Sequence, residues 1–212
     1  MCGIFGSNDR EQFFTLYKLN HKRGSYSYGC YYFNNNTSGG LWSNKQDITL
    51  NDIPAGMNYY LGHVRSPTSS TDYFTTSQCH PFSAEDIIYA HNGIISNTKE
   101  LENEYKQQWD VDSKWIGFLY SQYKKHELPY VSILQKIKGT FAIWSLNKNN
   151  NNITLARSAN PIYYSQNNNS FSSTEFKDSL LLKEGSLYRG DYKQIEQTDV
   201  VFTFKSPYFI PG

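Results

Sequence analysis

The sequence predicts an α+β domain in which β-sheets are stacked and helices are added to them. Its 212 residues fit one large domain better than two, so we expect residues 1–212 to form a single unit. Hydrophobic residues make up 38% of the chain and aromatic residues 17%, which is enough apolar material for a core. Strand-like runs precede and follow a central block of helical periodicity, a distribution typical of α+β domains.

The first third of the chain combines one helix with several short strands. Apolar side chains recur at spacings of three and four over residues 11–21, which predicts a helix. Apolar or aromatic runs predict strands in three places: 3–6, 26–33 and 58–64. Pro67 disfavours a helix at the residue before it and so ends the third strand. Polar runs predict loops in two places: 34–40 and 65–78.

The remaining residues begin with a strand over 86–90, which we expect to end at His91-Asn92-Gly93. Helices are predicted over three segments: 99–107, 114–125 and 131–137. Thr98 is the expected cap of the first of these helices, and Ser113 or Asp112 that of the second. Later strands are predicted at 140–147, 153–158, 162–165, 170–173 and 200–204. The asparagine-rich run 147–152 predicts a hairpin tip.

Charge and cysteine usage exclude several classes of protein. The net charge of +1 offers no basic surface for nucleic acid. No apolar run reaches the length of a membrane span, and the start has neither the charged n-region nor the apolar h-region of a signal peptide, so we expect a cytoplasmic protein without a membrane partner. Three cysteines without a CxxC pair argue against a disulfide framework. Cys79-His80 with His63 and His91 is an alternative zinc set, but zinc ligands are usually paired more closely, so we expect no metal or cofactor.

The start of the chain, MCGIFGS, has the residues of a terminal nucleophile. If Met1 is removed, Cys2 carries both a thiol and a free α-amine, with reference pKa values of about 8.5 and about 7.7–8.0. The neutral amine can accept the thiol proton, so one residue supplies nucleophile and base. The alternative is a cysteine that is in this strand by chance.

Three further positions suit acyl transfer on a small amino acid. Asn92-Gly93 could present an amide side chain and a closely approaching backbone N–H to an oxyanion, although Asn-Gly is also a strong hairpin signal. Arg65 could hold a carboxylate with two parallel hydrogen bonds, or form a structural ion pair. Asp112 could bind an ammonium group, cap the following helix, or do both.

Together these strings resemble the class II glutamine amidotransferases, glutaminase domains with an N-terminal nucleophile. The resemblance covers nearly the whole chain, and the order and spacing of its motifs carry it. The strings are MCGIFG (1–6), HKRGSYSYG (21–29), GHVRSPT (62–68), QCHPF (78–82), HNGIISN (91–97), VDSKWI (111–116), GTFAIWSL (139–146), LARSANPIYY (155–164) and FSSTEF (171–176). The implied fold is a four-layer αββα sandwich of the N-terminal nucleophile hydrolase type.

The resemblance also implies roles for single residues. Cys2 would be the nucleophile, and Asn92 and Gly93 would form the oxyanion hole. Arg65 would hold the α-carboxylate of glutamine and Asp112 its α-ammonium group.

Four more residues would support this site. Arg23 would order the loop beneath the thiol. Thr68 and His91 would help to hold the substrate, and His80 would support them.

The implied reaction is hydrolysis of the glutamine side-chain amide through a Cys2 thioester, with release of glutamate and ammonia. No P-loop or second synthase module follows within the 212 residues, so we expect a separate synthetase or transferase chain to accept the ammonia. One alternative is an amide hydrolase of the same fold acting on another γ-glutamyl-type substrate, against which Arg65 and Asp112 argue. Another is a non-catalytic regulatory subunit, against which Cys2, Asn92 and Gly93 argue.

Overall fold

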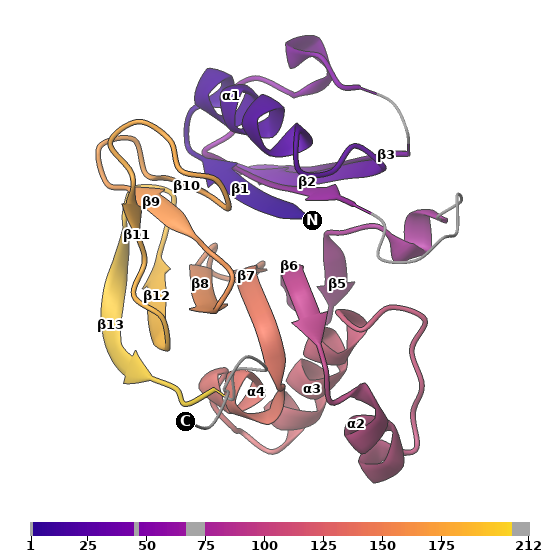
Figure 1. Ribbon diagram of the computed structural model, residues 1–212. Helices are drawn as coiled ribbons and strands as arrows, with labels where there is room; N and C mark the ends of the chain where they lie inside the picture. Colours follow the sequence, from indigo (N-terminus) through magenta and orange to yellow (C-terminus); the bar gives the residue numbers. More distant parts are fainter. Residues whose placement is uncertain (1, 45–46, 67–74, 205–212) are drawn as a thin grey trace, which may run out of the picture.

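Two antiparallel sheets lie face to face in the computed structural model, which describes residues 2–44, 47–66 and 75–204 (Figure 1). Within these residues the first sheet has seven strands in the order β11-β9-β10-β1-β4-β2-β3, and the second has six in the order β13-β12-β8-β7-β6-β5. The first sheet consists of β1 (Gly3–Ser7), β2 (Ser27–Phe33), β3 (Ser38–Asn44), β4 (Tyr59–Arg65), β9 (Tyr163–Ser165), β10 (Ser170–Ser172) and β11 (Leu180–Leu181). The second consists of β5 (Phe82–Ala84), β6 (Ile87–Ile95), β7 (Gly139–Asn147), β8 (Ile153–Ser158), β12 (Ser186–Gly190) and β13 (Ile195–Val201).

Helices cover the outer face of each sheet, as Figure 1 shows. The helix α1 (Arg10–His21) packs on the first sheet. Three others cover the second sheet: α2 (Thr98–Tyr105), α3 (Lys114–Lys125) and α4 (Val131–Lys136). The layers therefore run helix, sheet, sheet, helix, which confirms the predicted four-layer αββα sandwich.

Alternation along the strands assigns side chains to these layers. In β1, Ile4 points into the core between the sheets, whereas Phe5 packs against α1. The same alternation in β7 sends Trp144 between the sheets, where its indole Nε1 donates a hydrogen bond of 3.0 Å to the carbonyl of Gly62 on β4. The first sheet is thereby joined to the second by a buried hydrogen bond as well as by apolar packing.

The start of β1 lies at the junction of the sheets, above the ends of β6 and β7 in Figure 1. Helix α1 packs on the outer side of this strand. Its first turn is fixed by Asp9, whose side chain accepts a 2.6 Å hydrogen bond from the Gln12 backbone N–H. From the capped helix, Phe13 and Leu16 are buried in the same core as Phe5. These contacts tie the start of the chain into the domain.

Most predicted elements are confirmed, and α3 and β8 have the predicted bounds. The strand expected to end at residue 90 was wrong, because β6 continues to Ile95. The strand expected at 200–204 is β13, which runs earlier, and the loop expected at 34–40 contains the start of β3. Thr98 is the first residue of α2, and its N-cap is Asn97. Among the described residues, the longest and most apolar helix still falls short of what is needed to cross a membrane.

Candidate active site

A cavity of about 390 Å³ lies where the ends of β1 and β4 meet β6 and the segment leading into α3. Most of the predicted site residues line it: Cys2, Arg65, His80, His91, Gly93 and Asp112. They come from both sheets and from segments that are far apart in the sequence. Thr68, also predicted to belong to the site, lies outside the described residues.

Cys2 directly precedes β1 and is half-buried. Its thiol donates to the backbone carbonyl of Ser66 at 3.7 Å, and its own carbonyl accepts a 3.1 Å hydrogen bond from Nε of Arg23. Burial raises the pKa of the Cys2 thiol more than the contact with Ser66 and the positive charge of Arg65 lower it. The thiol is therefore protonated at neutral pH, and its use as a nucleophile requires a base.

The turn containing Arg23 and Gly24 is held against the last residue of β4. A Cβ atom at Gly24 would overlap the backbone of Arg65, so only glycine permits this approach. The Tyr26 N–H donates a 3.0 Å hydrogen bond to the Arg65 carbonyl. The Arg65 side chain donates from Nη1 to the carbonyl of Gln78, which positions its guanidinium at the cavity. This turn thus places Arg23 below Cys2 and supports Arg65.

Asn92 and Gly93 lie inside β6, opposite Ala142 and Phe141 of β7, so the hairpin-turn alternative is wrong. Gly93 has φ +149°, and a Cβ there would overlap the carbonyl oxygen of Thr140. Glycine is required at this position by both conformation and space. Its backbone lines the cavity.

The buried side chain of Asn92 is held from the first sheet. Its Nδ2 donates a 3.2 Å hydrogen bond to Oγ of Ser173, which also accepts a 3.0 Å hydrogen bond from the Ile4 N–H. The Asn92 carbonyl accepts a 2.8 Å hydrogen bond from Nδ2 of Asn160. A side-chain amide has two donor hydrogens, so one remains for a group other than Ser173.

Asp112 lines the cavity and directly precedes Ser113, which is the N-cap of α3. Its Oδ2 accepts a 2.8 Å hydrogen bond from the Ile95 N–H, and its Oδ1 accepts one of 2.8 Å from the Ser113 N–H. An ionised carboxylate can accept about four hydrogen bonds. With a third, longer hydrogen bond of 3.3 Å from Oγ of Ser113 to Oδ1, these bonds orient Asp112 and leave room for one further donor from a cation in the cavity.

Three buried histidines lie behind the cavity. The rings of His63 and His80 stack at 4.1 Å between centroids, and Nδ1 of His91 lies 2.8 Å from Oγ of Ser113. Within the described residues, Nε2 of His63 and His91 and both ring nitrogens of His80 have no hydrogen-bond partner. Burial lowers the pKa of all three, to about 3 for His63 and well below the ordinary value for His80. They are neutral at pH 7.

The alternative zinc set of the sequence analysis was wrong for the part of the chain described. That part contains no cluster of three or more His, Cys, Asp or Glu residues arranged to hold a metal ion. His63 and His80 instead stack on each other, and His91 contacts Ser113 at the start of α3.

Sequence reasoning missed the residues that orient Asn92. Ser173 directly follows β10 and Asn160 follows β8, and both come from segments read only as strands or their ends. The available signals were that polar residues follow strand-like runs in both places and that both residues lie in strings of the family resemblance, 155–164 and 171–176. Neither signal identifies a partner more than 60 residues away.

Comparison with known proteins identifies the relatives of this chain. The family model described as "Glutamine amidotransferase domain" matches residues 71–180, just over half of the chain. A 7-cyano-7-deazaguanine synthase 2 of Sulfurisphaera tokodaii is 36% identical over 93 residues, which cover 42% of this chain and 20% of the relative. A glutamine–fructose-6-phosphate aminotransferase of Oceanobacillus iheyensis is 25% identical over 162 residues, covering 68% of this chain and 26% of the relative. The chain thus spans about a fifth to a quarter of the length of these curated relatives.

Solved structures share the fold at low sequence identity. Glutamine phosphoribosylpyrophosphate amidotransferase from B. subtilis superposes with a TM-score of 0.70 and 16% identity, covering 94% of this chain and 50% of that one. A glutamine aminotransferase class-II domain protein from Silicibacter pomeroyi superposes with a TM-score of 0.54 and 12% identity, covering 94% and 100%. With the family match and the αββα architecture, these findings lead to one conclusion: the chain belongs to the glutamine amidotransferase family, and its domain is of class II.

Proposed function

We propose that this domain hydrolyses the side-chain amide of glutamine through a Cys2 thioester and supplies the ammonia to a separate acceptor enzyme. One observation carries the proposal. A thiol, a guanidinium group and an oriented carboxylate, from Cys2, Arg65 and Asp112, line the same cavity. These groups match the amide, the α-carboxylate and the α-ammonium group of a free amino acid with an amide side chain.

Substrate binding uses the two charged ends of glutamine. Arg65 forms a charge-assisted pair with the α-carboxylate, and Asp112 accepts hydrogen bonds from the α-ammonium group. Because the backbone N–H groups of Ile95 and Ser113 already fix Asp112, little ordering is left to occur on binding. His91 supports this side of the cavity through its contact with Ser113. Thr68 is proposed as a further substrate contact.

The chemical step begins after removal of Met1. The free α-amine of Cys2 accepts the thiol proton, and the thiolate attacks the amide carbon of glutamine. The resulting oxyanion is stabilised by the free donor of the Asn92 side chain and by the backbone at Gly93. The α-ammonium group then returns the proton to the leaving ammonia. Water attacks the thioester that remains, which releases glutamate and restores the thiol.

The supporting residues keep this geometry without touching the substrate. Arg23 binds the Cys2 carbonyl and so holds the segment that carries the thiol. His80 packs against His63 beneath the cavity. The acceptor of ammonia is proposed to be a synthetase or transferase, since relatives that this chain matches in part are named as a synthase and an aminotransferase.

The test measures glutamate and ammonia after incubating the purified chain with glutamine. We expect activity in the wild type, none in Cys2→Ala and at most a trace in Cys2→Ser, with the thermal midpoint of the Cys2 variants unchanged. Cys30→Ala is the control, because Cys30 is buried against α1, away from the cavity, and should keep the activity. Full activity of Cys2→Ala contradicts the mechanism.

Two further measurements separate the alternatives. Intact-mass measurement should show active protein without Met1, and an active preparation that fully retains Met1 contradicts the role of the amine. Glutamine whose α-carboxylate is converted to an amide should be a poor substrate. Equal cleavage of blocked and free glutamine would instead favour an amide hydrolase for other γ-glutamyl-type compounds.

A further inference from the structure

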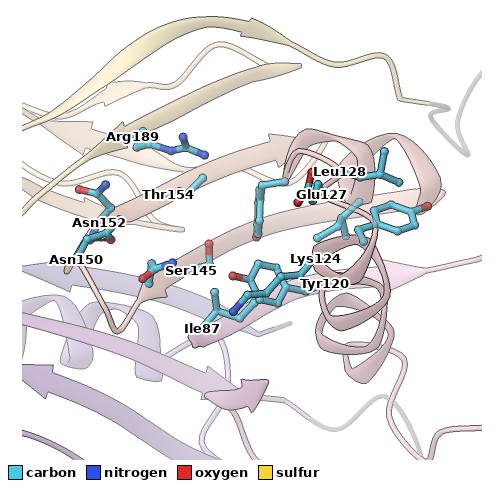
Figure 2. Close-up of a pocket in the computed structure, with 14 residues that line it drawn as sticks. Ile87, Tyr120, Lys124, Glu127, Leu128, Ser145, Asn150, Asn152, Thr154 and Arg189 are labelled. Atoms are coloured by element: carbon cyan, nitrogen blue, oxygen red, sulfur yellow. Dashed lines mark hydrogen bonds between the residues drawn. The ribbon is translucent and has the colours of Figure 1, made fainter. Parts of the chain in front are cut away.

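A second cavity, of about 340 Å³, lies on the outer face of the second sheet beside the C-terminal half of α3 (Figure 2). It shares no lining residue with the cavity that contains Cys2. Its volume falls near the lower end of the roughly 300–1,000 Å³ typical of small-molecule sites. The proposed glutaminase chemistry gives it no role.

The floor of this cavity is a polar row across three neighbouring strands. Ser145 on β7 pairs with Thr154 on β8, and Thr154 pairs with Arg189 on β12. Paired residues on adjacent strands point to the same face, so the three side chains lie side by side, as Figure 2 shows. Where α3 and α4 cover the same face, it carries an apolar cluster that includes Phe141, Ile143, Ala156 and Leu187. The change from apolar to polar residues therefore coincides with the cavity.

Arg189 brings a positive charge to the cavity. Its side chain makes no hydrogen bond or ion pair with any other residue in the described part of the chain. Glu196 lies opposite it on β13 but is bonded instead to Gln194 at 2.8 Å. By contrast, Lys124 in the same cavity pairs with Asp86 at 2.8 Å. An anionic ligand would therefore be held at the Arg189 end.

Further groups at this end have unused hydrogen-bonding capacity. The Tyr130 hydroxyl is buried without a hydrogen-bond partner among the described residues, close to the charge of Arg189. Asn152, half-buried at the tip of the asparagine-rich hairpin, has a side-chain amide that bonds to no other described residue. The asparagine-rich run 147–152 thus forms one edge of the cavity.

The opposite wall is apolar and aromatic. It is built mainly by Tyr120 and Tyr123 of α3, Ile133 of α4 and Ile87 of β6. Figure 2 shows Tyr120 and Ile87 on this wall, away from Arg189. Tyrosine rings suit a flat, apolar ligand body. Glu127 also lines the cavity.

We propose that this cavity binds a small organic anion with an aromatic body, whose carboxylate or phosphate is held by Arg189 and the hydroxyls of Ser145 and Thr154. The tyrosine wall contacts the ring of this ligand, and the amide of Asn152 hydrogen-bonds to its polar edge. A carboxylate and a phosphate can each accept two parallel hydrogen bonds from a guanidinium group, so Arg189 suits either anion.

The experiment uses the full chain and three probes: benzoate, phenyl phosphate and the neutral benzamide. Binding is followed by two-dimensional NMR of ¹⁵N-labelled protein, with the backbone signals of Ser145 and Thr154 as local reporters. We expect at least one of the two anions to bind with shifts at these reporters, and benzamide to bind at least about tenfold more weakly. The stronger anion distinguishes a carboxylate ligand from a phosphate ligand.

Variants decide whether the site is the one described. Arg189→Gln should weaken binding of the anion by about tenfold or more, because Arg189 is exposed and its loss leaves the fold intact. Lys177→Gln removes one positive charge from an exposed position elsewhere and should leave binding unchanged. The proposal is overturned if neither anion shifts the reporters at millimolar concentration, if benzamide binds equally well, or if Arg189→Gln binds like the wild type.

Discussion

The two walls of the candidate active site are built in different ways. The first-sheet wall, defined by Cys2, Arg23 and Arg65, lies at the ends of β1 and β4 and in a turn beside them. Its side chains donate hydrogen bonds to backbone carbonyls, such as those of Ser66 and Gln78. Removing one of these side chains leaves the strands and their core in place.

The second-sheet wall, defined by His91, Asn92 and Gly93, lies inside the nine-residue strand β6. All three residues pair with β7, and each is buried or closely packed. This difference indicates at which residues a substitution can change catalytic activity without changing the stability of the fold. Changes in the first-sheet wall should affect activity alone, whereas changes in the second-sheet wall should affect activity and stability together.

Asn92→Ala is expected to have the largest effect among changes in the second-sheet wall. Removing one oxyanion donor raises the barrier by about 2.7–4 kcal/mol, so kcat should fall by about 10² to 10³. The variant also leaves Ser173 without its buried partner, which should cost about 1 kcal/mol of unfolding free energy. Steady-state kinetics and urea unfolding measure the two effects. A variant with normal kcat would remove Asn92 from the mechanism.

Gly93→Ala tests the backbone of the same wall. The added Cβ overlaps the Thr140 carbonyl, and alanine is strained at φ +149°, so the free energy of unfolding should fall by about 2–3 kcal/mol. Gly56→Ala is the matched control, because Gly56 also has a positive φ, +77°, but has open space around it. It should cost only about 1 kcal/mol. Equal losses in the two variants would show that the close approach to Thr140 is unimportant.

The three buried histidines at the site predict a pH dependence of stability. The folded pKa values of His63, His80 and His91 are lowered, so the unfolded chain binds more protons between pH 6.5 and the folded values, about 3 for His63. Stability is complete above about pH 6.5 and is lost as pH falls, by up to about 1.4 kcal/mol per pH unit for each imidazole.

Urea unfolding between about pH 7.5 and about pH 5 measures this slope above the range in which carboxylates titrate. His80→Gln should reduce the slope by about one imidazole, because one buried ring no longer resists protonation. His126→Gln changes an exposed histidine and should leave the slope unchanged. A flat profile in the wild type over this range would contradict the buried, neutral state of the three rings.

Arg65→Lys tests the first-sheet wall. An ammonium group keeps the charge but not the two-point geometry, so KM for glutamine should rise by about tenfold. The free energy of unfolding should stay within about 0.5 kcal/mol of the wild type, because Arg65 ends its strand and is partly exposed. If Arg65→Lys lost as much unfolding free energy as Gly93→Ala, the proposal that changes in the first-sheet wall affect activity alone would be wrong.

The layers and most helices could be predicted because local patterns determine them. Residues 114–125 repeat apolar side chains at helical spacing, and the observed α3 has the same bounds. The same reasoning failed at Asn92-Gly93, where the turn-forming dipeptide lies inside a strand. Its left-handed glycine is explained by the neighbouring carbonyl of Thr140, a contact that no local pattern reveals. The motif residues of the site could be named from the sequence, but the hydrogen bonds that orient them join distant segments.

Ser173→Ala is expected to have the smallest effect, and it tests how the two walls are connected. Oγ of Ser173 accepts hydrogen bonds from Nδ2 of Asn92 on the second sheet and from the N–H of Ile4 on the first. Ser173 does not itself line the cavity, so we expect it to act by positioning Asn92. Without the Ser173 hydroxyl, the Asn92 amide is no longer held in one orientation. One neutral hydrogen bond contributes about 1 kcal/mol, so we expect kcat to fall by about five- to tenfold. KM should stay unchanged.

A merely structural role would instead lower stability and leave kcat normal. Ser173→Thr, which retains the hydroxyl, should recover most of kcat, and the double variant Asn92→Ala/Ser173→Ala should be no slower than Asn92→Ala alone. This non-additivity is the decisive measurement. If Ser173 acts only through its hydrogen bond to Asn92, removing Ser173 cannot lower kcat further once the Asn92 side chain is gone. If the two losses multiply, Ser173 acts on the reaction independently of Asn92, and the hydrogen bond between the walls does not position the oxyanion donor.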